Sequence, residues 1–99
     1  MYGAPAASTV SAVRFMVVET YLHGPGPVYE RVRAGGRRIP EGIVFVDSWV
    51  DDELGRCWQL MDAVSEEALR QWTSAWSDLV AFEIVPVVSS DEAARRALP

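Results

Sequence analysis

Residues 43–62 read IVFVDSWVDDELGRCWQLMD and contain two strand-like runs separated by an acidic, glycine-closed turn. The runs 43–50 and 56–62 are rich in β-branched and aromatic residues, which favour extended backbone. We predict a hairpin with a three-residue loop in which Gly55 takes the left-handed conformation and Trp49 pairs with Gln59. A four-residue loop would shift this pairing by one and invert the faces of one strand relative to the other.

Alternating strand and helix patterns continue on both sides of this hairpin. Upstream, residues 13–21 (VRFMVVETY) predict a strand, and a short helix is expected from Pro27 to the glycine pair at 35–36. Downstream, Ser65 suits the N-cap of a helix whose apolar residues recur at helical spacing. That recurrence comprises Leu69, Trp72, Trp76 and Leu79.

The last third of the chain completes the pattern. Residues 82–88 predict a strand that Pro86 restricts to a sheet edge or a bulge, and Ser89 suits the start of a short final helix. The order is therefore βαββαβ plus a terminal helix. This order predicts an α+β, ferredoxin-like fold: a four-stranded antiparallel sheet in the order 4-1-3-2 with both helices on one face.

Length and composition describe one globular domain. The chain has 99 residues, of which 49% are hydrophobic and 23% charged, and its net charge is −5. This acidic balance argues against general binding of nucleic acid or of anionic membranes, and no apolar run is long enough to span a bilayer. We expect a disordered tail at residues 1–12, a single domain at 13–99, and a cytoplasmic location, because the start lacks the features of a signal peptide.

The two faces of the predicted sheet differ in character. Even-numbered strand residues are almost wholly apolar and are expected to lie under the helices, against Trp72 and Trp76. Odd-numbered residues mix large apolar groups with polar ones: Phe15, Val17, Glu19, Tyr21, Phe45, Asp47, Trp49, Cys57, Gln59, Met61, Glu83, Val85 and Val87. Such a face is too apolar for water, so we expect a homodimer in which two sheets enclose a small-molecule cavity.

Three stretches resemble a known family. They are residues 37–49 (RRIPEGIVFVDSW), 56–62 (RCWQLMD) and 72–87 (WTSAWSDLVAFEIVPV). They are similar to a bacterial domain-of-unknown-function family, number 3303, whose members look like single ferredoxin-like domains of the dimeric α/β-barrel superfamily. The resemblance covers about residues 14–95 and brings no established catalytic residues. Superfamily relatives include cofactor-free monooxygenases, polyketide cyclases, lactone isomerases and haem-degrading enzymes, which implies a cavity but no particular reaction.

Proton transfer is the chemistry that the odd-numbered face favours. Glu19 and Glu83 fall on neighbouring strands, and two carboxylates in a semi-apolar cavity would form an acid/base pair. Tyr21 and the single histidine, His23, could assist near the cavity mouth. A plainer reading of the glutamates is equally open: they pair with Arg14, Arg37 or Arg56 from either subunit. For His23, an exposed loop residue is the more common case.

The remaining polar residues of this face suit a flat, partly oxygenated ligand. The predicted ligand-binding residues are Asp47, Trp49, Cys57, Gln59 and Met61. Cys57 is more readily explained as a buried, inert thiol, and Trp49 could simply fill a dimer core. No metal-binding motif occurs, so we expect no metal and no cofactor.

Two functions follow from this pattern. The first is a small cofactor-independent enzyme that uses acid/base chemistry on an aromatic or polyketide-like molecule, as a cyclase, isomerase or monooxygenase. The second is a non-catalytic dimeric module that binds a ligand or serves a structural role. A pocket of roughly 300 Å³ or more would favour the first function, and a solidly packed face would favour a structural dimer.

Overall fold

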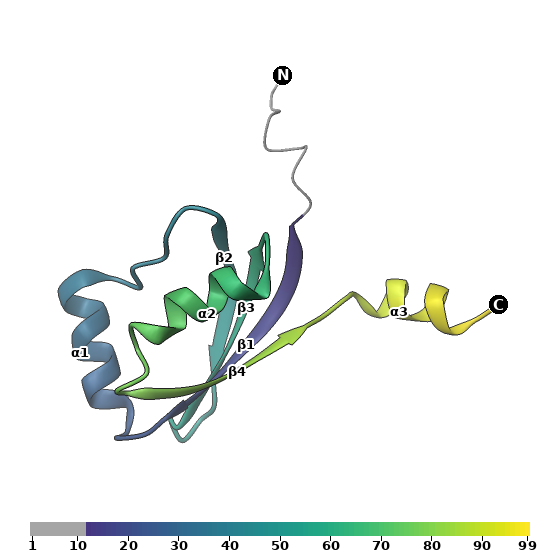
Figure 1. The fold of residues 1–99 in the computed structure, drawn as a ribbon. Coiled ribbons are helices and arrows are strands. Elements are labelled where there is room, and N and C mark those ends of the chain that lie inside the picture. The colour runs from purple at the N-terminus through teal and green to yellow at the C-terminus, as the bar shows by residue number, and fades with distance from the viewer. Residues whose placement is uncertain (1–11) are drawn as a thin grey trace.

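The computed structural model describes residues 12–99, which form a four-stranded antiparallel sheet with α1 and α2 on one face and α3 beyond its end (Figure 1). The elements in chain order are β1 (Val13–Tyr21), α1 (Pro25–Gly35), β2 (Ile43–Val50), β3 (Arg56–Ala63), α2 (Glu66–Ser74), β4 (Val80–Pro86) and α3 (Ser90–Ala97). The sheet order β2-β3-β1-β4 is the predicted one, so the βαββαβ fold class is confirmed. The tail predicted at residues 1–12 lies, except for its last residue, outside the described residues.

Local capping signals set most of the element boundaries. Ser65 accepts a hydrogen bond from the Ala68 amide at 3.2 Å, and Ser89 accepts one from the Glu92 amide at 3.1 Å. These bonds satisfy amide groups that the first helical turn leaves free. α1 begins at Pro25, two residues before the predicted start. β4 also begins and ends two residues before its predicted range, and its edge position explains how Pro86 is tolerated.

The hairpin between β2 and β3 has the four-residue loop, so the predicted three-residue loop is wrong. Val50 pairs with Cys57, and the Asp51 amide donates to the Arg56 carbonyl at 3.0 Å, which leaves residues 52–55 in the loop. Leu54, rather than Gly55, takes the left-handed conformation, with φ of 61°. The Asp51 carboxylate stabilises this loop by accepting from the amides of Gly55 at 2.8 Å and Arg56 at 2.7 Å.

The predicted assignment of faces is wrong for the two central strands. On β1 and β3 the odd-numbered residues lie under the helices, and Val17 and Met61 are completely buried. The register places Val17 beside both Gln59 and Ile84, so these residues share that face. On β4 the prediction was right: even-numbered residues face the helices, and Glu83 points to the uncovered side.

Strand β2 changes face part-way along because of a bulge. The pairing with β3 shifts between Phe45 and Asp47. Ile43 and Phe45 face the helices before the bulge, and even-numbered residues face them after it. Asp47 and Trp49 therefore lie on the uncovered side, where Trp49 is 52% exposed. One inserted residue of this kind inverts the side-chain alternation for the rest of a strand.

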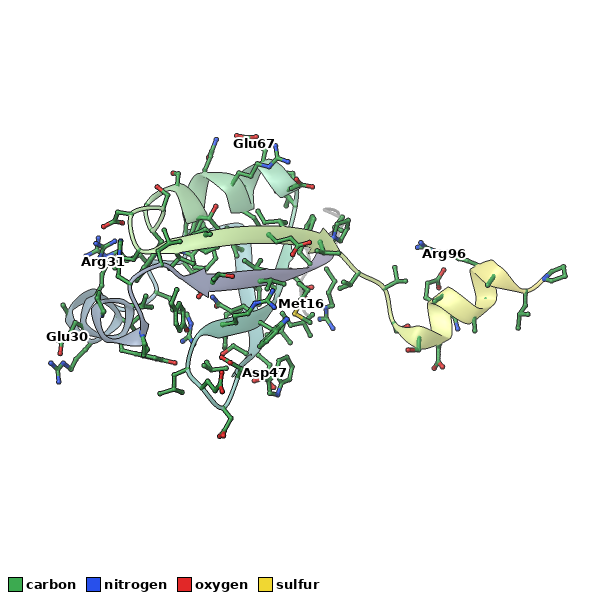
Figure 2. The ribbon with its side chains drawn as sticks, turned by 90° about the horizontal axis from the view of Figure 1, so that it is seen from below. Met16, Glu30, Arg31, Asp47, Glu67 and Arg96 are labelled. Carbon is green, nitrogen blue, oxygen red and sulfur yellow. The ribbon has the colours of Figure 1, made fainter. Side chains whose placement is uncertain are left out.

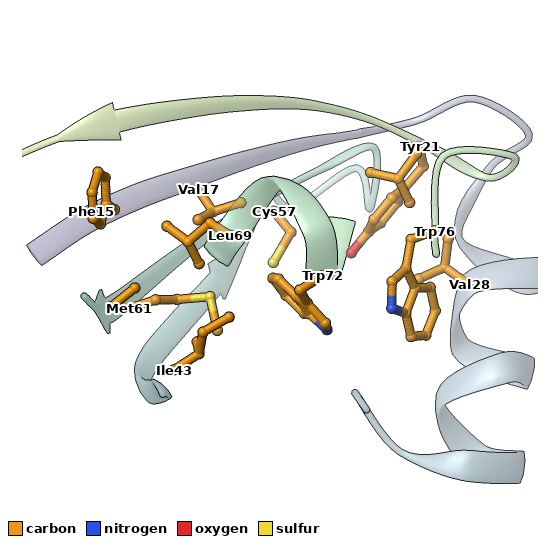
Figure 3. Close-up of a cluster of buried hydrophobic side chains, with 12 residues drawn as sticks. Phe15, Val17, Tyr21, Val28, Ile43, Cys57, Met61, Leu69, Trp72 and Trp76 are labelled. Carbon is orange, nitrogen blue, oxygen red and sulfur yellow. The ribbon is translucent and has the colours of Figure 1, made fainter. Parts of the chain in front are cut away.

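The hydrophobic core lies between the sheet and the two helices (Figure 3). Leu69 of α2 is completely buried, and Trp72 and Trp76 are buried as predicted. From α1, Val28 is buried, and Val32 packs against this cluster. By contrast, α3 contains no buried residue and stands away from the sheet (Figures 1 and 2).

Candidate functional site

A cavity of about 120 Å³ lies between the sheet and the helices, at the end of the core nearest α1. Residues from all four strands, from α1 and α2, and from the connections that follow these two helices surround it. They are Glu19, Tyr21, Val28, Tyr29, Val32, Arg37, Ser48, Val50, Cys57, Gln59, Trp72, Trp76 and Val80. Its walls are mostly apolar with a few polar groups, which is the usual composition of a small-molecule site.

Glu19 is the one acidic residue in the walls of this cavity. It is 7% exposed, and Gln59, which is 4% exposed, donates a hydrogen bond from Nε2 to Glu19 Oε2. The two side chains meet because Gln59 lies opposite Val17, which makes it the diagonal neighbour of Glu19 on the same face. Burial raises the pKa of Glu19 from 4.5 to about 7, although the Gln59 hydrogen bond and the charge of Arg37 partly oppose this. Glu19 can therefore gain or lose a proton near neutral pH.

Tyr21 and Cys57 add two protonated groups beside Glu19. Burial, with the neighbouring Tyr29 hydroxyl, raises the pKa of Tyr21, and the two tyrosine rings meet edge to face at 6.3 Å. Figure 3 shows the Tyr21 hydroxyl directed into the core from β1. Burial and the charge of Glu19 raise the pKa of Cys57 to about 11. At neutral pH Tyr21 is thus a hydrogen-bond donor, and Cys57 is a protonated thiol rather than a nucleophile.

Two polar atoms of the cavity residues are buried without a partner among residues 12–99. They are the Oε1 acceptor of Gln59 and the Nε1–H donor of Trp76. By contrast, Nε1 of Trp72 donates to the main-chain carbonyl of Arg37 at 2.9 Å. An unpaired buried polar group typically costs ~1–3 kcal/mol of stability. A polar ligand that reached these atoms would recover part of that free energy.

Arg37 marks the exposed side of the cavity. Its guanidinium lies 4.3 Å from the centre of the Phe45 ring, and Nη2 donates to Ser48 Oγ at 3.4 Å. Arg37 was predicted only as an ion-pair partner, and Ser48 was not predicted as a site residue. Ser48 lies under the helices, as expected for an even-numbered strand residue, but the site was predicted on the other face of the sheet.

The predicted site residues divide between the two faces of the sheet. Glu19, Tyr21, Cys57 and Gln59 come together in the cavity, within one chain rather than between two sheets as expected. Met61 is buried in the same layer but does not line the cavity. Asp47, Trp49 and Glu83 lie on the uncovered face, and His23 is exposed in the turn before α1.

The predicted pair of Glu19 and Glu83 does not form. β4 places Phe82 opposite Glu19 and Glu83 opposite Val18, so the two carboxylates project from opposite faces. Arg14, one of the three arginines considered as partners for the glutamates, instead binds Asp62 of the same chain at 2.8 Å. Glu19 is therefore a solitary buried carboxyl with an amide neighbour.

A second, larger hollow of about 370 Å³ lies between residues 38–41 and α2, and it is more open to solvent. It contains no buried acidic or basic residue. Across residues 12–99 no cluster of three or more histidine, cysteine or acidic side chains could hold a metal ion. The Glu19 cavity is therefore the stronger candidate site.

The family model described as "Domain of unknown function (DUF3303)" matches residues 13–98, which is nearly the whole chain. The chain belongs to this family. No curated protein and no solved structure matches it. In residues 12–99 no helix has the length and apolar character needed to cross a membrane. Membership of the DUF3303 family assigns no reaction to the chain.

Proposed function

We propose that this protein is a small, cofactor-independent enzyme that performs acid/base chemistry on an aromatic or other small carbonyl-containing molecule held in the Glu19 cavity. The observation that carries the proposal is a buried carboxyl, with a pKa of about 7, in a cavity walled by aromatic rings. Perturbed carboxyl groups of this kind are typical of general acids and bases. Glu19 replaces the pair of glutamates as the proposed proton-transfer group.

The volume of the cavity limits the ligand. An engineered cavity of ~150 Å³ holds one benzene molecule, and drug-sized ligands need pockets of at least ~300 Å³. At about 120 Å³ the cavity is somewhat smaller than that benzene site, so it suits a short chain or a single ring that extends to the exposed side, whereas a fused polyketide would not fit. Trp72, Trp76 and Tyr21 supply flat apolar surfaces suited to such a ring.

The geometry supports a proton shift within the ligand. The Glu19 carboxylate would take a proton from a carbon next to a carbonyl group. Tyr21, which stays protonated, would donate a hydrogen bond to the resulting enolate oxygen. Glu19 would then return the proton to another atom of the ligand, so the reaction needs no external reagent. Isomerisation is therefore the simplest member of the predicted reaction classes.

The uncovered face of the sheet supports a homodimer of the dimeric α/β-barrel type. It carries exposed apolar residues, including Val44, Trp49 and Val85. Arg56 on this face stacks on Trp58 and forms no ion pair within residues 12–99, and Glu83 likewise has none. A second copy could bury the apolar residues and pair these opposite charges.

Sedimentation equilibrium tests the dimer. We expect Trp49→Glu to yield monomers and Leu98→Glu to leave the dimer intact, because Leu98 directly follows α3, away from the sheet. Leu98 is 69% exposed and Trp49 is 52% exposed, so the control replaces an apolar residue that is at least as accessible. A wild-type monomer at micromolar concentration would contradict the dimer but not the chemistry at Glu19, because the cavity is complete within one chain.

Deuterium exchange tests the acid/base chemistry. Acetophenone, a single-ring ketone, would be incubated with the protein in D₂O while NMR follows the loss of its methyl protons. We expect the wild type to accelerate exchange, Glu19→Gln to abolish the acceleration, and Glu83→Gln to retain it. An acceleration that survives Glu19→Gln would rule out proton transfer by this residue.

A non-catalytic binding module is the second candidate. The cavity volume of about 120 Å³ favours it, because this volume falls short of the ~300 Å³ set above as favouring an enzyme. Binding of single-ring compounds without any Glu19-dependent exchange would support this alternative. The indole N–H signals of Trp72 and Trp76 report such binding directly, because both rings line the cavity.

A further inference from the structure

Arg37 is unusual among the arginines of this chain. All nine basic residues are arginines within residues 12–99. Six of them form ion pairs with acidic side chains: Arg14, Arg31, Arg33, Arg70, Arg95 and Arg96. Arg37, Arg38 and Arg56 form none within the same residues, and of these three only Arg37 lines the Glu19 cavity. The cavity thus has one cation at its exposed side and no bound carboxylate to neutralise it.

The position of Arg37 is fixed from three directions. The Phe45 ring supports the guanidinium at 4.3 Å, Ser48 Oγ accepts from Nη2 at 3.4 Å, and Trp72 binds the Arg37 carbonyl at 2.9 Å. A guanidinium held in this way needs little further ordering to bind an anion. Its planar pair of N–H groups matches the two oxygens of a carboxylate, and the Ser48 hydroxyl can donate a third hydrogen bond.

We infer that the natural ligand is a small monocarboxylate whose carboxylate binds Arg37 and Ser48 while its apolar body enters the cavity toward Glu19. This inference rests on the proposed small-molecule site and names the class of molecule that the site takes. The volume of about 120 Å³ accommodates the body of a single-ring acid, because the carboxylate stays at the exposed side.

Binding of such an anion would be coupled to protonation of Glu19. The titratable and charged side chains around the cavity are Glu19, Tyr21, Tyr29, Arg37 and Cys57. The charge of Arg37 lowers the pKa of both Glu19 and Cys57, so the guanidinium interacts electrostatically with groups inside the cavity. A bound carboxylate would neutralise this charge and favour protonated Glu19. Affinity should therefore fall as pH rises through about 7.

Paired NMR titrations with benzoate and benzamide test the inference. The two probes have nearly the same shape, but only benzoate is charged. We expect benzoate to bind the wild type, Arg37→Gln to weaken it by roughly tenfold to a hundredfold, and Arg38→Gln to change it less than twofold. Benzamide should bind Arg37→Gln and the wild type equally. Benzoate, but not benzamide, should bind more weakly at pH 8 than at pH 6.

The variants separate this inference from the proposed function. Arg37→Lys keeps the charge but not the planar fork, so it should recover only part of the benzoate affinity. If benzamide binds as well as benzoate and Arg37→Gln affects neither, the carboxylate anchor is wrong while the small-molecule site stands. Equal losses in Arg37→Gln and Arg38→Gln would also overturn it, because they would indicate general charge attraction. Failure of both probes to bind would overturn the site and the anchor together.

Discussion

Replacing Glu19 with glutamine should stabilise the protein above pH 7 and leave its stability nearly unchanged at pH 5. Burial raises the pKa of Glu19 from 4.5 to about 7, so the folded state holds this proton more tightly than the unfolded state. Its contribution to stability is complete below pH 4.5 and is lost as pH rises through 7. At 1.36 kcal/mol per pKa unit, the loss amounts to about 3 kcal/mol by pH 8. An amide at this position cannot ionise, so it avoids that loss.

Urea unfolding at pH 5, 6, 7 and 8, followed by tryptophan fluorescence at constant ionic strength, measures this difference. The other shifted groups do not interfere in this window. The pKa values of Asp51, Asp62, Asp78 and Glu92 are lowered by their hydrogen bonds, so these groups titrate at more acidic pH. The pKa of Cys57 is raised to about 11, so its thiol stays protonated throughout.

The difference in unfolding free energy between Glu19→Gln and the wild type should grow from below ~1 kcal/mol at pH 5 to about 3 kcal/mol at pH 8. Glu83→Gln is the matched control, because it makes the same chemical change at an exposed residue on the opposite face of the sheet. It should show a small difference that does not vary with pH. Two results would refute the reasoning. One is a Glu19→Gln protein that is less stable than the wild type at pH 8, and the other is a difference in unfolding free energy that stays the same at every pH.

Three further predictions concern the scaffold, and the same unfolding assay checks them. Leu69→Ala should cost ~2–5 kcal/mol, because Leu69 is completely buried and its truncation leaves a cavity. Asp51→Ala should cost ~1–2 kcal/mol, because the amides of Gly55 and Arg56 lose their shared acceptor. Removal of residues 89–99 should cost less than ~1 kcal/mol, since α3 contains no buried residue; a larger loss would show that α3 packs on the domain.

The order of elements was predictable because short-range signals specify it. Ser65 and Ser89 cap the helices as their sequence positions indicate, and Pro86 lies in an edge strand. These signals act between residues that are close in sequence, so their effect does not depend on the tertiary packing. The hairpin loop was less predictable, because Leu54 takes a left-handed conformation that is unusual for a branched apolar residue.

The burial of each face could not be predicted from residue type alone. Both faces of β1 and β3 are apolar enough to form a core: Val17 is buried on one, and Val18 is also largely buried on the other. Glu19 and Gln59 led to the wrong assignment, because polar residues favour the face that the helices do not cover. Their mutual hydrogen bond across the strands permits both to be buried. This hydrogen bond depends on the register between β1 and β3, which cannot be read from the sequence.

The candidate site was half predictable for the same reason. Four site residues were selected together because they are odd-numbered positions on adjacent strands: Glu19, Tyr21, Cys57 and Gln59. Residues that alternate in this way share one face of the sheet, whether that face is covered by helices or not. Arg37 was missed because it reaches the cavity from the connection after α1, where Trp72 donates a hydrogen bond to its carbonyl. Ser48 was missed because the site was predicted on the face opposite the even-numbered residues of β2.

The ionised Glu19 carboxylate lowers the free energy of unfolding at high pH, whereas an amide at this position would not. Glutamine has the same size and could accept the same hydrogen bond from Gln59, yet it would spare the protein about 3 kcal/mol at pH 8. That is a large fraction of the ~5–15 kcal/mol by which a domain of this kind is stable. Packing therefore gives no reason for a carboxyl at this position. The property that glutamate has and glutamine lacks is an exchangeable proton near pH 7, and the cavity beside it is where that proton can be used.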